Sequence, residues 1–341
     1  MFEKYENSGL SGLENLGNTC FINSSMQIIS HIYELKDAWD KPVNKEILSS
    51  NQSNDCVLLK EWISLENDMW KQNCMISPRR FIKSIQIISN EKGKDIFTGW
   101  AQNDLPEFLV FLIDCFHNAV KREVIMKING TVKNSKDKVA KVCFEMIENM
   151  YKKEYSNIID LFYGIHVSYI NNMEGKNLSL KPEPFFMLDL PTTNTTNDIY
   201  KCLELYCSEE LLNGDNQWKD DKTGNKYDVK KNIMFWSLPK ILVITFKRWD
   251  MTGKKRRSVI NFPLEDLDLR KYIVGYNSKS YMYDLFGVCN HTGSNLGGHY
   301  TSYVKTANKK WYHFNDLNVT EMKEKDIISA KAYCLFYRKK N

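Results

Sequence analysis

The chain carries the side-chain types of a thiol hydrolase in two short segments that lie far apart in the sequence. Cys20 lies near the N-terminus, whereas His299, Asn315 and Asp316 lie near the C-terminus. Thiol hydrolysis uses a cysteine nucleophile, a histidine base and a polar group that orients the histidine, and folding brings these groups together from distant segments. We therefore ask which elements of the fold position these residues.

Cys20 follows the polar turn Gly17-Asn18-Thr19 and opens an apolar run that ends near Ile32. The spacing of the apolar residues predicts a helix over residues 20–32, and the positive end of a helix dipole favours a thiolate. Most free cysteines are buried core residues, but a core cysteine needs no polar turn before it. The amide of Asn15 could donate to an oxyanion or bond its own backbone in a turn, and the local sequence leaves both readings open.

His299 has surroundings that suit a general base. Gly297 and Gly298 precede it, and glycines let a loop approach a substrate backbone closely and move as a lid. The other histidines read as structural or surface residues. Asn315 or Asp316, after the next predicted strand, can fix the tautomer of the His299 ring.

The composition is that of a folded domain without a strongly charged partner. The chain has 341 residues, 43% of them hydrophobic, and a formal net charge of +5, which argues against nucleic acid as the main partner. The start of the chain resembles no secretory signal, and no apolar run approaches the ~20 residues of a membrane span. Nine cysteines without any Cys-x-x-Cys pair favour reduced thiols in a cytoplasmic or nuclear compartment.

Helical periodicity dominates the first half of the chain, and strand periodicity dominates the second. Further helices are predicted over 57–70, over 104–120, around 136–150, and after Ser77 as N-cap and Pro78. Strands are predicted over 162–170, 185–190, 229–238, 241–248, 283–289, 300–305, 310–314 and 332–338. This order favours an α+β fold, with helices followed by an antiparallel sheet.

Two charged segments could each have either a functional role or an ordinary structural one. Asp104 and Glu107 begin a predicted helix, so they are either ordinary partners of its dipole or a carboxylate pair that receives the arginines of a basic peptide. The run Lys254-Lys255-Arg256-Arg257 lies between two predicted strands. We interpret it as a solvated hairpin tip rather than as a nucleic-acid patch.

Four sequence boxes, one of them in two parts, together resemble the ubiquitin-specific protease family of cysteine deubiquitinases. Residues 13–27 match the family's cysteine box, and residues 297–300 and 311–316 match its histidine box. Residues 102–108 are similar to its Gln-Gln-Asp-Ala-x-Glu-Phe box, although Asn103, Leu105 and Pro106 depart from it. Residues 238–248 are similar to its Leu-Pro-x-x-Leu strand, which ends in arginine. The matches run from about residue 12 to about residue 338, so the resemblance covers nearly the whole chain.

The resemblance implies a papain-like fold with a helical thumb, an antiparallel palm and a finger-like β extension. It implies a single catalytic domain over 1–341, with the thumb at about 10–155, the fingers and part of the palm at about 160–240, and the palm with the histidine box at about 241–341. It also implies that the enzyme hydrolyses the (iso)peptide bond after the C-terminal glycine of ubiquitin, without a cofactor. The expected partners are ubiquitin and ubiquitinated proteins, with no membrane partner, and a monomer is the favoured state.

The resemblance also assigns roles to individual residues. Cys20 would be the nucleophile, His299 the base and then the acid, Asn315 the third member of the triad, with Asp316 as its alternative, and Asn15 the oxyanion donor. The ubiquitin tail would be held by a second set of residues: Gln102, Asp104, Glu107, Gly297, Gly298 and Tyr300.

One departure concerns the fingers. Most family members bind zinc there through two Cys-x-x-Cys pairs, whereas the corresponding turns of this chain are residues 171–174 and 219–222, which contain no cysteine. We therefore expect fingers without metal. Three other functions remain open: a hydrolase for another ubiquitin-like modifier, a ubiquitin-binding pseudoenzyme, and an unrelated papain-type protease or transferase.

Overall fold

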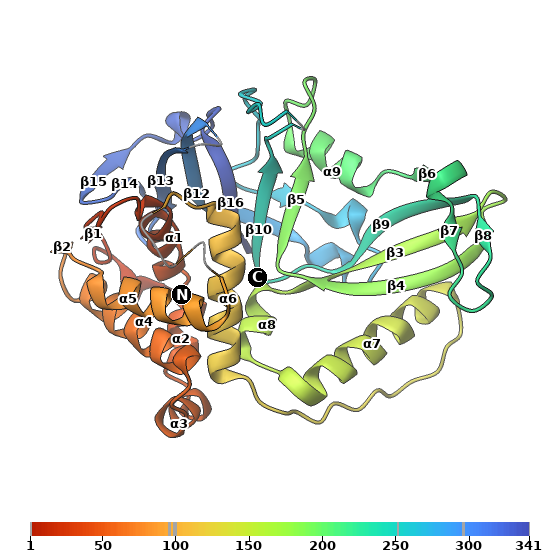
Figure 1. Cartoon of the computed structure of the whole chain (residues 1–341), viewed down its shortest axis with the longest axis horizontal. Coiled ribbons are helices and arrows are strands. Elements are labelled where there is room, and N and C mark those ends of the chain that lie inside the picture. Colours follow the sequence, from red (N-terminus) through yellow and green to blue (C-terminus); the bar gives the residue numbers. More distant parts are fainter. Residues whose placement is uncertain (1, 95–96, 98–100, 251, 295–296, 341) are drawn as a thin grey trace.

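Helices occupy much of the chain up to residue 162, and strands occupy much of the remainder (Figure 1). The structure is a computed structural model, and it describes all residues except 1, 95–96, 98–100, 251, 295–296 and 341. The helices are α1 (Cys20–Ser30), α2 (Tyr33–Trp39), α3 (Pro42–Ser50), α4 (Asn54–Lys71), α5 (Arg79–Glu91), α6 (Leu105–Val120), α7 (Ser135–Glu154), α8 (Asn157–Phe162) and α9 (Ile199–Cys207).

Helices α1 to α6 form the thumb, and a side chain caps the N-terminus of α4, through Ser53, and of α6, through Asp104. Asp104 caps α6 by accepting a hydrogen bond from the backbone N–H of Glu107, and Pro106 occupies the first turn. Helix α1 is buried along its whole length, because it lies between the other thumb helices and the palm strands. The prediction that Ser77 caps α5 is wrong: Pro78 is the N-cap, and the Ser77 hydroxyl accepts from the Arg79 guanidinium at 3.3 Å.

The palm is one mixed sheet that carries the second half of the candidate site. Its strands lie in the order β15-β14-β13-β12-β16-β10-β5, and β11 pairs with β12. Their bounds are β5 (Met187–Pro191), β10 (Ile241–Lys247), β11 (Leu267–Asp268), β12 (Met282–Ser294), β13 (Gly297–Lys305), β14 (Trp311–Asn315), β15 (Asn318–Met322) and β16 (Ala332–Lys339). The neighbours are antiparallel except for β5, which runs parallel to β10. The intervening residues 192–240 form a connection long enough for such a crossover.

The fingers form a second, antiparallel sheet that extends away from the palm (Figure 1). Their strands are β3 (Gly164–Asn172), β4 (Asn177–Phe185), β6 (Glu210–Leu212) and β9 (Val229–Ser237), in the order β4-β3-β9-β6. A small hairpin of β7 (Trp218–Lys219) and β8 (Lys226–Tyr227) lies at the far end, and α7 covers one face of the sheet. In the thumb, β1 (Gly12–Leu13) pairs with β2 (Met75–Ile76) in parallel.

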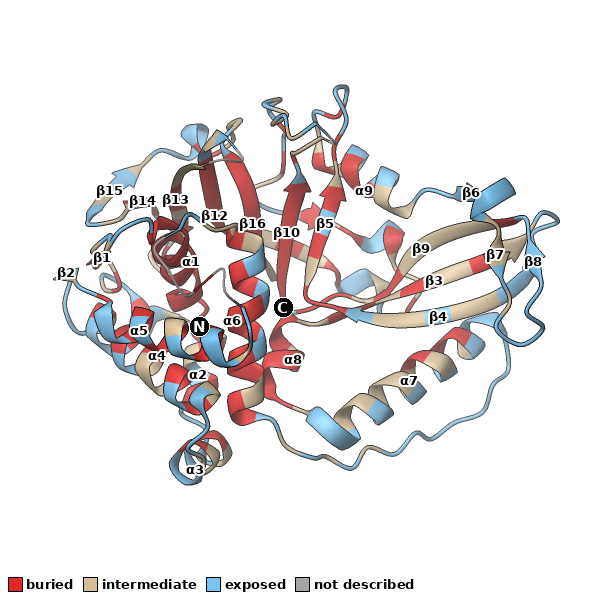
Figure 2. Ribbon diagram, viewed as in Figure 1, coloured by how far each residue is buried: buried red, intermediate tan, exposed pale blue. Residues whose placement is uncertain are grey.

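The buried residues concentrate in the thumb and the palm, whereas the fingers are more exposed (Figure 2). One apolar cluster joins α1, α4, α5 and α6 to strands β10, β12 and β16, so the helical layer packs directly on one face of the palm sheet. A second cluster covers the other face of that sheet and includes α9. Because α1 and the strand that bears His299 share the first cluster, apolar packing fixes the two halves of the candidate site relative to each other.

Some elements differ from the sequence prediction. The strand expected from residue 162 begins at Gly164, because residues 157–162 form α8. The segment 185–190 is not one strand, because β4 ends at Phe185 and β5 begins at Met187. His291, one of the histidines read as structural or surface residues, lies inside β12.

Candidate active site

The turn before Cys20 is held by the side chain of Asn15. The Asn15 Oδ1 atom accepts from the backbone N–H groups of Gly17 and Thr19, each at 3.1 Å. Gly17 and Asn18 both have positive φ angles, of 104° and 53°. Such angles suit glycine and are tolerated by asparagine, so the residue types fit this turn. The turn places Cys20 at the first position of α1.

Cys20 lies at the N-terminus of α1 but is only 4% exposed. Burial raises the pKa of its thiol, and the nearby Asp316 carboxylate acts in the same direction, whereas the backbone N–H groups of Tyr300, Phe21 and Cys20 lower it. The backbone N–H groups at the helix N-terminus favour the thiolate, as predicted, but burial outweighs them and the net effect is a raised pKa. The hydrogen bond from the Tyr300 backbone places the sulfur beside the residue that follows His299.

His299 bonds directly to Asn315. The distance from His299 Nε2 to Asn315 Oδ1 is 2.7 Å, whereas Asp316 Oδ2 lies 4.0 Å from the same nitrogen. A carbonyl oxygen can only accept, so this contact selects the tautomer with hydrogen on Nε2 and leaves the Nδ1 lone pair available as a base. The strands β13 and β14 that carry the two residues are antiparallel neighbours.

Asp316 instead joins the histidine segment to the cysteine segment. Its Oδ1 accepts from Asn23 Nδ2 at 2.7 Å, and its Oδ2 accepts from Asn15 Nδ2 at 3.0 Å. Its backbone oxygen accepts from the N–H of Leu13 at 3.0 Å. The Asp316 carboxylate is thus occupied by two side-chain amides of the thumb, and one N–H of the expected oxyanion donor Asn15 faces this carboxylate.

Gln102 connects three predicted segments. Its Nε2 donates to Asn18 Oδ1 at 3.3 Å, and its Oε1 accepts from the backbone N–H of Gly298. A Cβ atom on Gly298 would lie 2.4 Å from His291 Nε2, and one on Gly297 would lie 2.7 Å from Gln102 Oε1. Glycine is therefore required at both positions for the strand to pass this closely.

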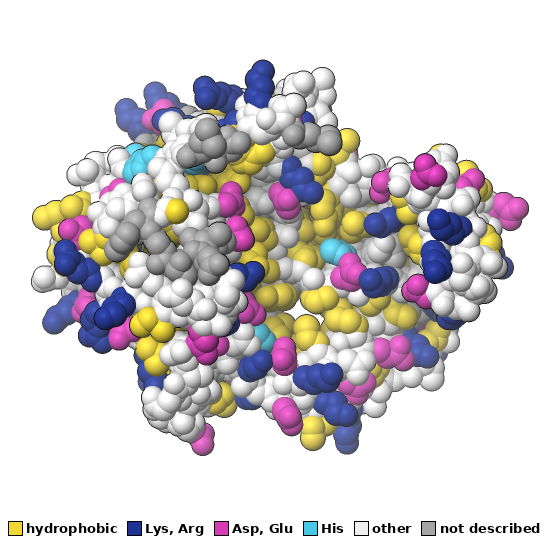
Figure 3. All heavy atoms as spheres, viewed as in Figure 1, with side chains coloured by type: hydrophobic (Ala, Val, Ile, Leu, Met, Phe, Trp, Pro, Cys, Tyr) yellow, Lys and Arg dark blue, Asp and Glu magenta, His cyan; other side chains and the backbone are white. Residues whose placement is uncertain are grey.

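A narrow cavity of about 180 Å³, here called the tail channel, runs beside this point; its lining residues are Gln102, Asn103, Asp104, Trp249, His291, Ser294, Gly297 and Tyr300. The Tyr300 hydroxyl accepts from the backbone N–H of Leu105 at 3.5 Å, so the ring forms part of the wall. Figure 3 shows a hollow between the thumb and the fingers, with hydrophobic side chains gathered around it.

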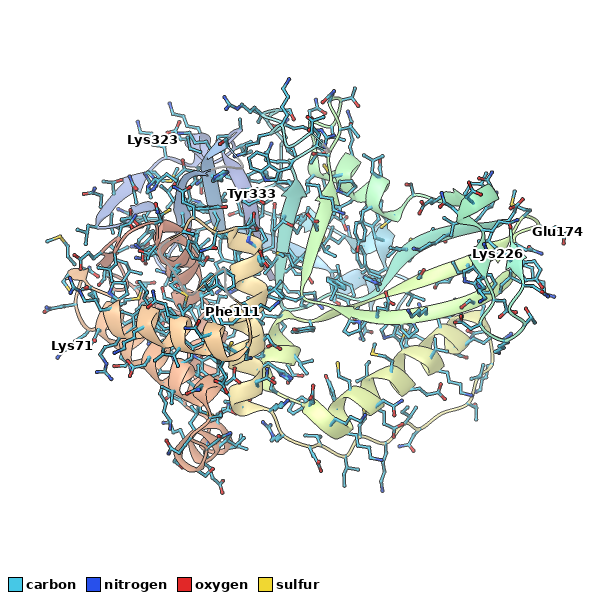
Figure 4. The ribbon with its side chains drawn as sticks, viewed as in Figure 1. Lys71, Phe111, Glu174, Lys226, Lys323 and Tyr333 are labelled. Carbon is cyan, nitrogen blue, oxygen red and sulfur yellow. The ribbon has the colours of Figure 1, made fainter. Side chains whose placement is uncertain are left out.

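Asp104 and Glu107 lie at the start of α6, where Asp104 is the N-cap and Glu107 lies in the first turn. Asp104 Oδ2 accepts from the Tyr333 hydroxyl at 2.8 Å, and its Oδ1 caps α6. Burial raises the pKa of the Asp104 carboxyl. Figure 4 shows Tyr333 at the end of β16 that lies above α6. Glu107 is exposed, so Glu107 is the better placed of the two to meet a cationic side chain.

Asn23, Trp249, His291 and Tyr333 belong to the site but were not predicted as site residues. Asn23 lies inside the cysteine box, so its place in the box was an available signal. Tyr333 lies 229 positions from the carboxylate that it contacts, and no local pattern indicates this pair.

The structure contains no grouped metal ligands in the fingers or elsewhere among the described residues: no cluster of three or more His, Cys, Asp or Glu is placed to hold a metal ion. The helices of the described segments include none that is both long and apolar enough to cross a membrane.

Comparison with known proteins gives the family. The family model described as "Ubiquitin carboxyl-terminal hydrolase" matches residues 11–337. Ubiquitin carboxyl-terminal hydrolase 2 of Bos taurus is 32% identical over 96% of this chain and 55% of its own length. The protein of the same name in Gallus gallus is 33% identical over 96% of this chain and 93% of its own length. The chain therefore spans little more than half of the bovine relative.

The fold is also that of solved deubiquitinase structures. A chain of the SAGA DUB module with Ubp8, Sgf11, Sus1 and Sgf73, solved bound to monoubiquitin, matches with a TM-score of 0.73 and 22% identity, over 98% of this chain and 70% of that chain. This likeness confirms the predicted α+β, papain-like fold class. The chain belongs to the ubiquitin carboxyl-terminal hydrolase family, within its ubiquitin-specific protease branch.

Proposed function

We propose that this protein is a thiol-dependent deubiquitinase that hydrolyses the (iso)peptide bond after the C-terminal glycine of ubiquitin. The observation that carries the proposal is the 2.7 Å contact between His299 and Asn315 on strands that pack on the helix bearing Cys20. The family match and the relatives' names support the same activity. The solved SAGA DUB module, which shares this fold, was bound to monoubiquitin, and this supports ubiquitin as the partner.

The proposed reaction has an acylation and a deacylation step. His299 Nδ1 takes the thiol proton as Cys20 Sγ attacks the carbonyl carbon of the terminal glycine, and the same imidazolium then protonates the leaving amine. The product is a thioester on Cys20. Water, deprotonated by His299, attacks this thioester and releases the ubiquitin carboxylate and the free thiol. Asn315 keeps Nε2 protonated throughout.

The oxyanion is assigned to donors around Cys20. One N–H of the Asn15 amide bonds to Asp316, and the amide carries a second N–H that can donate to the oxyanion. The backbone N–H groups of Cys20 and Phe21, which lower the pKa of the thiol, are further donors close to the sulfur. The charge that develops on the carbonyl oxygen would therefore meet preformed N–H groups.

The tail channel suits a peptide that ends in glycines, because its walls already contact each other through Gly297, Gly298 and Gln102. Exposed Glu107 is placed to meet an arginine of the tail. We further propose a single catalytic domain over the chain, acting as a monomer, in a reducing compartment. All nine cysteines are free, which is consistent with the last point.

The decisive experiment is covalent labelling with ubiquitin that carries a thiol-reactive group at its C-terminus. We expect a mass shift of one ubiquitin in the wild-type protein and none in Cys20→Ala. Cys74→Ala is the matched control, because Cys74 is a half-buried thiol of the same lobe, and this variant should label like wild type. Failure to label, with free ubiquitin still bound, would favour a pseudoenzyme. Labelling by a probe for another ubiquitin-like modifier, but not by the ubiquitin probe, would show that the other modifier is the substrate.

A further inference from the structure

A basic hairpin, whose described residues are 249, 250 and 252–257, borders the tail channel. Trp249 and Lys255 form an antiparallel bridge across it, and Asp250 Oδ1 holds its turn by accepting from the backbone N–H of Thr252 at 2.9 Å and of Lys254 at 3.0 Å. The Trp249 side chain lines the channel. The position of this hairpin therefore sets where one wall of the channel lies.

Lys255 is not the solvated residue that the sequence suggested. Its Nζ lies 2.8 Å from His291 Nδ1 and donates to the backbone oxygen of His291 at 2.8 Å. The same ammonium lies 5.5 Å from the centre of the Trp249 ring and 5.9 Å from that of Tyr333, within the range of a cation–π contact. Its neighbours Lys254 and Arg257 are exposed, so Lys255 differs from them in position and not in charge.

His291, the partner of Lys255, lies on β12, which pairs with the strand that carries His299. His291 on β12 is the register partner of Tyr300 on β13, and their ring centres are 4.6 Å apart. The next register pair along is Thr292 with His299. Lys255 thus joins the hairpin wall, through His291, to the strand that carries the proposed base.

The base of the hairpin has an independent anchor. Arg248 is fully buried, and its guanidinium donates to the backbone oxygens of Ala332 and Ser258, each at 2.9 Å. Loss of the Lys255 contact would therefore leave both ends of the hairpin base in place. It would free the part beyond the base, in which Lys255 pairs with Trp249.

We propose that Lys255 is a positioning residue that fastens the basic hairpin to His291 and thereby holds Trp249 against the tail channel. This proposal rests on the proposed function, because it assigns the channel to the C-terminal tail of the substrate. Lys255 touches no reacting atom. Lys255 affects the width of the channel. The substrate contacts the channel in the same way in the ground state and in the transition state, so a change in width affects the binding of both equally.

The protonation states around Lys255 are consistent with this contact. Burial and the Lys255 charge lower the pKa of His291 to about 4, so its ring is neutral and Nδ1 can accept from the ammonium. Burial, Arg248 and Arg257 lower the pKa of Lys255 to about 8. The other ionisable groups packed around this cluster are Tyr300 of β13, Tyr333 of β16 and Asp104 at the start of α6. The ammonium is therefore present at pH 7 and is lost as the pH rises through about 8.

The test compares Lys255→Met with Lys254→Met, which removes the same charge from an exposed site on the same hairpin. For hydrolysis of a ubiquitin conjugate at pH 7, Lys255→Met should raise KM about tenfold with kcat changed less than twofold. Lys254→Met should change neither by more than twofold. Lys255→Arg keeps a cation with several donors and should restore most of the lost affinity. The KM ratio of Lys255→Met to wild type should fall toward one by pH 9.5, because wild type then lacks the charge as well.

A second readout needs no activity. Hydrogen exchange of the Asp250 and Arg256 amides, which bond within the hairpin and its base, should be several-fold faster in Lys255→Met than in Lys254→Met. If wild type does not cleave ubiquitin conjugates, the proposed function fails, while this exchange measurement still tests the fastening. Equal exchange in the two variants, or an equal KM in a cleaving enzyme, would overturn the proposal. A fall in kcat alone in Lys255→Met would also overturn it.

Discussion

Asn315 and Asp316 are neighbours in sequence, yet their side chains serve different halves of the site. Asn315 is the last residue of β14 and reaches His299, whereas Asp316 has a φ of 50° and turns toward Asn15 and Asn23. The sequence left either residue as the partner of His299, because both follow the same strand. The left-handed turn at Asp316 points its side chain away from that of Asn315. No residue pattern in the sequence predicts this turn.

Removing the amide of Asn315 should impair the chemistry and spare the fold. In Asn315→Ala the imidazole loses the acceptor that fixes its tautomer, so we expect kcat to fall about 100-fold with little change in KM or thermal stability. Asn315→Asp keeps an acceptor at the same place and should retain most of the activity. Steady-state kinetics with a fluorogenic ubiquitin substrate measures both variants. An unchanged kcat in Asn315→Ala would show that another group orients His299.

Asp316→Asn should act on stability as well as on rate. The carboxylate accepts from two amide groups, and an amide in its place can offer only one acceptor, which leaves an N–H facing an N–H in a mostly buried site. We expect the free energy of unfolding to fall by about 1–3 kcal/mol. Denaturant unfolding of Asp316→Asn and of Asn315→Ala compares the free energies of unfolding of the two variants. Equal stability of the two variants would contradict the anchoring role of Asp316.

The thiol of Cys20 gives a prediction about pH. Because burial raises its pKa above the ordinary value of 9.0, the neutral thiol dominates at pH 7 and the thiolate fraction grows as pH rises. The rate of Cys20 alkylation by a small neutral reagent, followed by peptide mass spectrometry, should increase steadily from pH 6 to pH 9. A plateau between pH 5 and pH 8 would instead indicate a preformed ion pair with His299.

At the scale of elements, the periodicity of apolar residues predicted the regular helices and strands. Tertiary contacts determined the features that this periodicity did not predict. The helix from Cys20 and the strands around His299 follow from apolar spacing and lie close to where they were predicted. The parallel pairing of β5 with β10 depends on which edge of the sheet is free. The burial of Lys255 within a run of four cations depends on His291, 36 residues away. Neither feature has a local signal.

The end of the fingers gives a prediction for a single hairpin. Glu174 and Lys226 mark this end in Figure 4, and the described residues there hold no metal cluster. Trp218 and Tyr227 are register partners on β7 and β8, with ring centres 6.5 Å apart. Such a cross-strand aromatic pair contributes about 0.5–1 kcal/mol.

Trp218→Ala should therefore loosen the β7–β8 hairpin without affecting the rest of the chain. The Asp220 amide, which donates to Asn225 inside the hairpin, should exchange about twofold to fivefold faster. Tyr227→Ala should have a similar effect, and the double variant should add little, because the two rings act as a pair. Fully additive effects would show that the rings do not stabilise each other.

At the scale of the whole molecule, the thumb and the palm are connected by a few polar contacts around the candidate site. Asp104 meets Tyr333, Gln102 meets Gly298, and Asp316 meets two asparagines of the thumb. Farther away, Arg338 donates to Glu34 at 2.9 Å. Each contact crosses from the helical lobe to the sheet, so the width of the tail channel depends on how the two lobes are held together.

The bond between Tyr333 and Asp104 is the most direct test of this dependence. Tyr333→Phe removes the hydroxyl, leaves a mostly buried carboxylate without that donor and weakens the attachment of the start of α6 to the palm, where the contact of Leu105 with Tyr300 remains. We expect a loss of about 1–3 kcal/mol in the free energy of unfolding. We also expect KM for a ubiquitin substrate to rise about tenfold with kcat nearly unchanged, since uniform binding is lost.

Tyr337→Phe is the matched control on the same strand. The hydroxyl of Tyr337 donates to the backbone oxygen of Pro263 at 2.7 Å, within the palm and away from the channel. This variant should lose stability, because a largely buried hydrogen bond is removed, but it should keep the wild-type KM. If both variants raise KM equally, general loosening of the palm explains the effect. If neither does, the position of α6 does not control the channel. A rise confined to Tyr333→Phe would show that the contact between the lobes sets substrate affinity.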